Sequence, residues 1–195
     1  MTPLALIRHA PTAWNRQGRM QGREDVPLLD ESRADLMRRR IPAAYAKFRA
    51  LSSPLRRCLE TAAMLRLAVS PDARLTEMDW GEYQGRTLAE LRHAHGADLA
   101  TNEARGLDFR PPGGESPRDV QMRVAPLLRE LGAAGRPTIA VTHRGVIRAI
   151  YARATNWDMT GDPPEELDVY ALHLFALDRN GVPRVERLNL PLEVK

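Results

Sequence analysis

The sequence Leu4-Ala5-Leu6-Ile7-Arg8-His9 places a short apolar run directly before an arginine and a histidine. An apolar run of this length that stops at a charged segment is typical of a strand buried in a sheet. A second run of the same kind, Thr138-Ile139-Ala140-Val141-Thr142, ends at His143. We therefore expect both histidines at the carboxyl ends of buried strands, which is the edge where ligands bind in open α/β sheets.

The rest of the chain alternates between strand and helix patterns. Residues 47–53 predict a brief strand, and Asp178-Arg179-Asn180-Gly181 predicts a turn between strands over 170–177 and 183–190. Ser116-Pro117-Arg118-Asp119 predicts a helix start with Ser116 as N-cap. Apolar spacing predicts helices over 30–46, 55–67, 117–131 and 145–154, with Pro42 weakening the first helix and Pro54 at the first position of the second.

This order of elements predicts an α/β fold, a three-layer sandwich whose largely parallel central sheet carries helices on both faces. The chain of 195 residues fits a single domain, 1–195, with its own core. The least regular stretch, 96–115, is compatible with a flap over a site and equally with a plain surface loop.

Composition excludes several classes of protein. Cys58 is the only cysteine, which excludes an intramolecular disulfide framework and a cysteine-rich metal site. No apolar run reaches the ~18 residues of a membrane span, and the first residues lack the cationic flank of a signal peptide. Net charge is only +4, and the one basic run, Arg38-Arg39-Arg40, fits a solvated helix face better than a nucleic-acid patch. We expect a cytoplasmic protein without a membrane or nucleic-acid partner.

Arginines cluster at the same predicted sheet edge as the two histidines. Arg8 precedes His9, Arg57 lies in the first turn after a strand-to-helix junction, and Arg144 and Arg148 follow His143. A helix N-terminus favours an anion, and a guanidinium adds two donors shaped for phosphate oxygens. The remaining histidines lack this context, so we expect structural or surface roles for His93, His95 and His173.

Taken together, these segments resemble the histidine phosphatase superfamily, the phosphoglycerate-mutase-like proteins. The resemblance extends from Leu4 to about Arg148, and its motifs occur in the family's order. They are Leu6-Ile7-Arg8-His9-Ala10-Pro11-Thr12-Ala13-Trp14-Asn15, Gln21-Gly22-Arg23-Glu24-Asp25-Val26-Pro27-Leu28, Ser53-Pro54-Leu55-Arg56-Arg57-Cys58-Leu59-Glu60-Thr61-Ala62, Leu75-Thr76-Glu77-Met78-Asp79-Trp80-Gly81-Glu82-Tyr83-Gln84-Gly85, Gly114-Glu115-Ser116 and Val141-Thr142-His143-Arg144-Gly145.

The resemblance implies a set of roles. His9 would be the nucleophile that carries the phosphoryl group, and Glu77 the general acid and base, with Asp79, Glu82 and Glu115 as competing carboxylates. Arg8, Arg57 and His143 would stabilise charge at the transition state without a metal or another cofactor. Further contacts to the phosphate or substrate would come from Asn15, Gln21, Gly22 and Arg144.

This chain also departs from the family pattern. Ala10 and Pro11 stand where a glycine and a polar residue are usual, and Ser32 stands where a glycine is common. The residues expected to do the chemistry are all present, so the predicted activity is that of a phosphatase acting on a small phosphorylated metabolite.

Two other functions stay open at this point. One is a phosphoglycerate-type mutase, although mutases of the family tend to carry inserted segments for which this chain has little room. The other is a non-catalytic phosphoryl-binding or regulatory module. Specificity is expected to lie in 96–112 and 155–166. The oligomeric state is left open, with a homodimer among the options.

Overall fold

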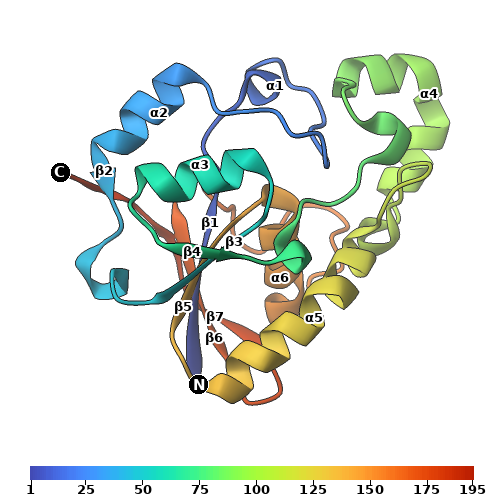
Figure 1. Ribbon diagram of the computed structural model, residues 1–195. Helices are drawn as coiled ribbons and strands as arrows, with labels where there is room; N and C mark the ends of the chain where they lie inside the picture. Colours follow the sequence, from blue (N-terminus) through green and yellow to red (C-terminus); the bar gives the residue numbers. More distant parts are fainter.

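A computed structural model describes residues 1–195, and its centre is a six-stranded sheet (Figure 1). The strand order is β4-β3-β5-β1-β6-β7. The strands β1 (Thr2–Arg8), β3 (Arg49–Ser52), β4 (Val69–Pro71) and β5 (Thr138–Thr142) run parallel, while β6 (Leu172–Leu177) and β7 (Pro183–Leu190) form the predicted antiparallel hairpin.

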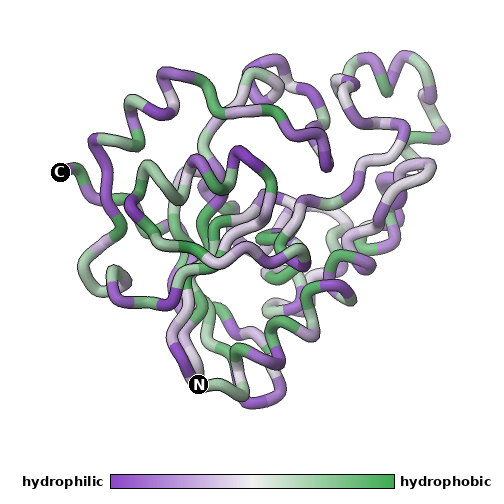
Figure 2. Tube along the Cα trace, viewed as in Figure 1, coloured by the Kyte–Doolittle hydropathy of each residue, from purple (hydrophilic) through white to green (hydrophobic).

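Both predicted buried strands, β1 and β5, lie in the middle of this sheet, because the side chains of each contribute to an apolar core on either face. Along β1, Leu4 and Leu6 belong to one apolar core, and Ala5 and Ile7 to the other. This is the alternation with a period of two that a strand imposes on its side chains. Figure 2 shows apolar residues concentrated along the same central strands.

Helices cover the two faces and complete three layers. The first core packs against α5 (Pro117–Ala134) and α6 (Arg144–Thr155), and the second against α2 (Asp30–Met37) and α3 (Arg56–Met64). This confirms the α/β prediction of a sheet with helices on both faces. The remaining helices are α1 (Ala13–Arg16), α4 (Leu88–Glu103) and the 3₁₀ turns η1 (Ala43–Tyr45), η2 (Ala73–Leu75), η3 (Gly81–Tyr83) and η4 (Gly106–Asp108).

The predicted helix over 30–46 is wrong beyond Met37. Arg39–Arg40 forms a short strand, β2, which pairs with β8 (Glu193–Val194) near the carboxyl terminus. Arg39 and Arg40 form ion pairs with Asp35 and Glu193, so the basic run is not a helix face. The strand that pairs with β2 lies more than 150 residues away in the chain, so the spacing of residues around Arg39 could not predict this pairing.

Two other boundaries also differ from the prediction. The helix after Pro54 begins at Arg56, because Leu55 is extended (φ −65°, ψ 136°) and serves as the N-cap. The stretch 96–115 is not uniformly irregular, since α4 continues to Glu103 through a bend at Gly96 (φ 44°). The predicted start of α5 is confirmed, because Ser116 and Asp119 form a capping box with Pro117 in the first turn.

None of the helices combines the length and the apolar character that a membrane span requires.

Candidate active site

The carboxyl ends of β1 and β5 bring His9 and His143 together. The two strands are parallel neighbours in which Arg8 pairs with Thr142, and the His9 backbone N–H donates to the Thr142 carbonyl at 3.0 Å. The two imidazole rings lie 5.2 Å apart, centroid to centroid. Both are buried, so the sheet edge predicted from the sequence holds a closely packed pair of histidines.

The ring of His9 is fixed in one tautomer by its own neighbour. Nδ1 lies 2.8 Å from the carbonyl oxygen of Ala10, and since a carbonyl only accepts, Nδ1 carries the proton and donates it. Nε2 is left with a free lone pair. Burial, followed by the charges of Arg8 and Arg57, holds the pKa of His9 well below its usual value. The imidazole is therefore neutral at physiological pH, the state that a nucleophile needs.

Arg57 is fully buried and is held by backbone carbonyls rather than by a carboxylate. Its guanidinium donates to the carbonyls of Gly22 and Glu24, each at 2.7 Å. Gly22 has a φ of +53°, a backbone conformation that favours glycine, and a Cβ there would come within 2.3 Å of Gln84 Oε1. Gly22 thus contributes its backbone to the site by holding Arg57.

Three buried side-chain nitrogens in the whole chain have no hydrogen-bond partner: Arg8 Nε, Gln21 Nε2 and Arg57 Nε. All three belong to residues that the sequence predicts to bind phosphate. A buried donor without a partner costs about 1–3 kcal/mol, and an anion that accepted from it would remove this cost. The site is thus an array of donors that lacks an acceptor.

His143 stands at the N-cap of α6 and is held by a residue that the sequence reasoning did not single out. Its Nε2 lies 2.8 Å from Ser53 Oγ, and this hydroxyl also accepts from the Leu55 N–H at 3.3 Å. The hydroxyl of Ser53 therefore links the ring of His143 to the start of α3. Burial, followed by Arg57, His9 and Arg8, lowers the pKa of His143 well below its usual value.

Thr61 was also missed as a functional residue. Its hydroxyl accepts from the Ala10 N–H at 3.0 Å and donates to the Arg57 carbonyl at 2.7 Å, so it joins the nucleophile loop to α3. Both Ser53 and Thr61 belong to the quoted motif around Arg57. Ser53 before the predicted helix and Thr61 on its apolar face were the sequence features that could have identified these two residues.

Glu77 is the buried carboxylate of the site. Its Oε1 accepts from the Met78 N–H at 2.9 Å and its Oε2 from the Gly145 N–H at 3.3 Å, and it forms no ion pair. Burial raises its pKa, opposed by these two hydrogen bonds and by the charges of Arg57 and Arg8. A raised pKa keeps the proton available for donation near neutral pH.

The competing carboxylates are already engaged or exposed. Asp79 and Glu115 both pair with Arg23, and Glu115 also pairs with Arg123 at 3.0 Å. Glu82 is exposed. Of the four candidates named from the sequence, Glu77 has the environment of a general acid.

Most of the predicted residues line one cavity of about 570 Å³: Arg8, His9, Asn15, Gln21, Gly22, Glu77 and Arg144. Arg57 and His143 lie behind this lining, linked to it through the Gly22 carbonyl and the His9 ring. Asn15 Oδ1 caps α1 by accepting from the Thr12 N–H at 3.1 Å, so its amide nitrogen is the part left for a ligand. No group of three His, Cys, Asp or Glu side chains is arranged to bind a metal ion.

Two of the sequence expectations outside the site also agree with the structure. His93 and His95 are exposed on α4. His173 is buried in β6, where its Nε2 lies 3.1 Å from the Asp168 carbonyl and its Nδ1 accepts from the Asn189 N–H. All three therefore have surface or structural positions.

Comparison with known proteins agrees with this geometry. The chain is 38% identical over 184 residues to a glucosyl-3-phosphoglycerate phosphatase of Mycolicibacterium vanbaalenii, covering 81% of this chain and 78% of the relative. It is 33% identical over 163 residues to a 2,3-bisphosphoglycerate-dependent phosphoglycerate mutase of Gloeobacter violaceus, covering 77% and 74%. A mycobacterial glucosyl-3-phosphoglycerate phosphatase, solved in complex with inorganic phosphate, superposes with a TM-score of 0.79 at 28% identity over 98% of both chains. The family model of the histidine phosphatase superfamily (branch 1) matches residues 4–191, and the chain belongs to that family.

Proposed function

We propose that this protein is a metal-independent phosphatase that hydrolyses small organic phosphate monoesters through a phosphohistidine on His9. The observation that carries the proposal is the set of unpartnered buried donors of Arg8, Gln21 and Arg57 beside a neutral histidine. A phosphoryl group placed there accepts from these donors while its phosphorus faces the free lone pair of His9 Nε2. The match to phosphatases of the same family supports this assignment.

In the first step, His9 Nε2 forms a bond to phosphorus while the bond from phosphorus to the ester oxygen breaks. Glu77 transfers its proton to the departing oxygen, so the leaving group departs as a neutral alcohol. Arg8, Arg57 and the hydrogen-bond donor of His143 stabilise the charge on the phosphoryl oxygens. In the second step, Glu77 accepts a proton from water, the water oxygen attacks phosphorus, and phosphate leaves with His9 restored.

The names of the relatives indicate which substrates to test first. Glucosyl-3-phosphoglycerate is the substrate named for the M. vanbaalenii phosphatase, and phosphoserine phosphatase 1 of Hydrogenobacter thermophilus is 29% identical to this chain. A mutase is the second candidate, because the G. violaceus relative carries that name at 33% identity. A mutase would return the phosphoryl group from His9 to another hydroxyl of the substrate instead of giving it to water.

The test combines His9→Ala with a search for phosphorylated enzyme. The wild type should release phosphate from p-nitrophenyl phosphate and, quenched during turnover, should carry acid-labile phosphate. His9→Ala should lose both, with the rate falling by about three orders of magnitude or more. His95→Ala, which removes an exposed histidine of α4, serves as the matched control and should keep both.

Two results would contradict the proposal. Isomerised phosphoglycerate without free phosphate would identify a mutase. A wild type that binds phosphate esters but never carries acid-labile phosphate would identify a non-catalytic phosphoryl-binding module.

A further inference from the structure

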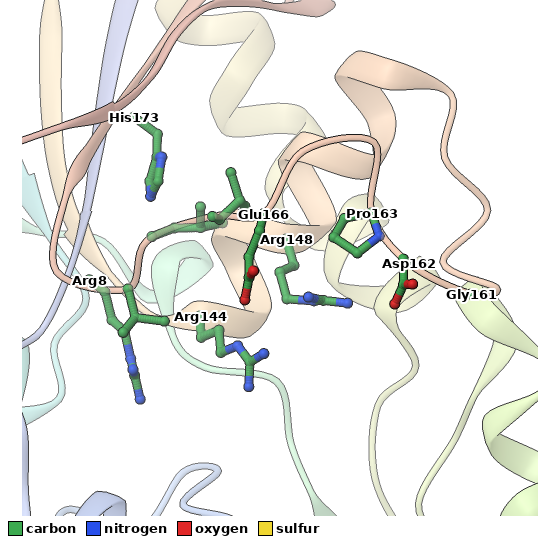
Figure 3. Close-up of a pocket in the computed structure, with 11 residues that line it drawn as sticks. Arg8, Arg144, Arg148, Gly161, Asp162, Pro163, Glu166 and His173 are labelled. Atoms are coloured by element: carbon green, nitrogen blue, oxygen red, sulfur yellow. The ribbon is translucent and has the colours of Figure 1, made fainter.

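The arginines near the active site fall into two groups according to what they contact. Arg8, Arg144 and Arg148 line a cavity of about 600 Å³ beside the active-site cavity, and none of the three forms an ion pair. In Figure 3 the side chains of Arg144 and Arg148 extend into this space beside Arg8. Arg123 lines neither cavity and is bound by the carboxylate of Glu115. Its guanidinium is therefore not available to a ligand, and its contacts indicate a different role.

The general acid lies in a part of the chain that no helix or strand holds in place. Residues 77–79, here called the acid segment, have no regular secondary structure. The Glu77 carboxylate is held by the N–H groups of Met78 and Gly145, and Met78 belongs to the acid segment itself. A misplacement of about 1 Å at a reacting group costs about 100-fold in rate. The position of Glu77 therefore depends on contacts that fix the backbone of the acid segment from outside.

Two residues, Arg123 and Glu115, make all the hydrogen bonds between the backbone of the acid segment and other segments. Glu115 Oε2 accepts from the Asp79 N–H at 3.1 Å, and the Glu115 N–H donates to the Asp79 carbonyl at 2.9 Å. Arg123 Nη2 lies 3.5 Å from the Glu77 carbonyl, and Nη1 donates to the Arg74 carbonyl at 2.7 Å. The chain is thus held both before and after the catalytic carboxylate.

The pair of Arg123 and Glu115 is itself well fixed. Two parallel contacts of 3.0 Å join Nε to Oε1 and Nη2 to Oε2, and each side chain is only 19% exposed. Burial raises the pKa of Glu115, but its hydrogen bonds and the charge of Arg123 outweigh this effect and hold that pKa below its usual value. Arg123 stands on α5, where Val120 and Val124 are buried in the apolar core. A helix anchored in the core therefore sets the position of the acid segment.

Arg23 extends this network to the phosphate-binding side of the site. Its guanidinium lies 3.0 Å from Glu115 Oε1 and 3.3 Å from Asp79 Oδ2. Arg23 belongs to the loop whose backbone carbonyls hold Arg57. The carboxylate of Glu115 consequently contacts both the acid segment and the loop that orients the phosphate-binding arginine.

We propose that Arg123 and Glu115 are positioning residues for the general acid, which hold the acid segment so that the Glu77 carboxylate faces the ester oxygen of the substrate. Neither residue touches the substrate, and both act through the backbone of the acid segment. This inference rests on the proposed phosphatase function, in which Glu77 gives its proton to the leaving group.

The test is the rate of Arg123→Met with two esters that differ in their need for a proton. For glycerol 3-phosphate, kcat/KM should fall by about 10- to 100-fold, because the acid is displaced from a strongly basic leaving group. For p-nitrophenyl phosphate it should fall by about threefold or less, because p-nitrophenolate needs little protonation. Arg123→Lys keeps the charge but not the paired contacts, and should restore part of the rate with glycerol 3-phosphate.

A double variant separates positioning of the acid from a general structural role. In Glu77→Gln the acid proton is already absent, so displacing the segment has no proton transfer left to impair. Adding Arg123→Met to Glu77→Gln should therefore lower kcat/KM for glycerol 3-phosphate by no more than for p-nitrophenyl phosphate.

The same helix offers a matched control. Arg118 forms two contacts, of 2.6 and 2.9 Å, with the carboxylate of Asp108 and makes no contact with the acid segment. Arg118→Met should keep the wild-type rates with both esters. If circular dichroism shows that Arg123→Met is unfolded, Glu115→Gln carries the test. It keeps the size of the side chain and an oxygen for the Asp79 N–H, and should give a smaller loss with the same dependence on the ester.

A folded Arg123→Met that loses equally with both esters, or that retains the wild-type rates, overturns the positioning role. Equal losses in Glu115→Gln do the same where this variant carries the test, and so does a full additional loss with glycerol 3-phosphate in the double variant. A wild type that hydrolyses neither ester, or a Glu77→Gln that loses equally with both, instead overturns the function on which the inference rests.

Discussion

Replacing Glu77 by glutamine tests the proton transfer that the geometry assigns to this residue. Glutamine keeps the size of the side chain and a carbonyl oxygen for the Met78 N–H, 2.9 Å from Oε1, but it has no proton to give to a leaving group. The hydrogen bond lost is the longer one, from the Gly145 N–H at 3.3 Å. One such bond is worth about 1 kcal/mol, a small part of the roughly 5–15 kcal/mol that stabilises a domain, so the variant should fold.

The size of the kinetic effect depends on the leaving group. A positioned general acid contributes about 10²- to 10⁴-fold, which corresponds to about 2.7–5.4 kcal/mol of transition-state stabilisation. An alkoxide such as that of glycerol needs the full contribution because it is a strong base. p-Nitrophenolate is a weak base and needs little protonation. Glu77→Gln should therefore lower kcat/KM for glycerol phosphate by about two to four orders of magnitude and for p-nitrophenyl phosphate by about tenfold or less.

The pH dependence gives a second readout of the same assignment. Burial raises the pKa of Glu77, so its proton is present at low pH and is lost as the pH rises through that pKa. The wild-type rate with glycerol phosphate should therefore fall on the alkaline side, and this limb should be absent in Glu77→Gln. Glu82→Gln, which changes an exposed carboxylate of the same motif, should behave like the wild type in both assays. Equal losses for the two esters in Glu77→Gln would refute the general-acid assignment.

Two further predictions concern the groups around this carboxylate. A Cβ at residue 145 would lie 2.4 Å from Glu77 Oε1, so Gly145→Ala should displace the carboxylate. The variant should hydrolyse glycerol phosphate about tenfold more slowly or worse, with a smaller effect on p-nitrophenyl phosphate. Steady-state kinetics test this, and an unchanged ratio of kcat/KM between the two esters would contradict it. Burial holds the pKa values of His9 and His143 well below the ~6.5 of an unfolded chain. Their contribution to stability is therefore complete above about pH 6.5 and is lost as the pH falls below that value, because the unfolded chain then takes up protons that the folded protein does not. Urea unfolding at pH 7.5 and 5.0 measures this loss, and equal free energies of unfolding at the two values would contradict it.

Sequence patterns predicted the parts of the site that depend on local order. A buried strand that ends in a charged residue places that residue at the edge of the sheet, and this placement does not depend on distant parts of the chain. This is why Arg8, His9 and His143 meet where the two apolar runs end. The capping box of α5 could also be predicted from the sequence, because Ser116 and Asp119 lie within one turn of each other.

The contacts that the sequence did not reveal join segments far apart in the chain. The Arg56 N–H at the start of α3 donates to Asp25 Oδ1 at 2.7 Å, a cap supplied from a distant loop, which explains why the helix begins after Leu55 and not at Pro54. Ser53 reaches His143 across 90 residues. The spacing of apolar residues depends on neighbours within a few turns of the chain, so it carries no information on these distant partners.

The departures at Ala10 and Pro11 fit the geometry of the nucleophile loop. The group that orients His9 is the carbonyl of residue 10, which any residue supplies, and Ala10 keeps a negative φ because none of the four non-glycine residues with positive φ lies in this motif. Ala10 belongs to the apolar core that also contains Cys58 and Ala62, and its N–H donates to the Thr61 hydroxyl. Pro11 lacks an N–H, but its carbonyl still accepts from the Leu29 N–H at 3.1 Å. A glycine at position 10 would give the unfolded chain more conformational freedom to lose on folding, so alanine stabilises the fold relative to glycine at this position. Alanine and proline therefore stiffen the turn that presents His9, without removing a hydrogen bond on which its tautomer depends.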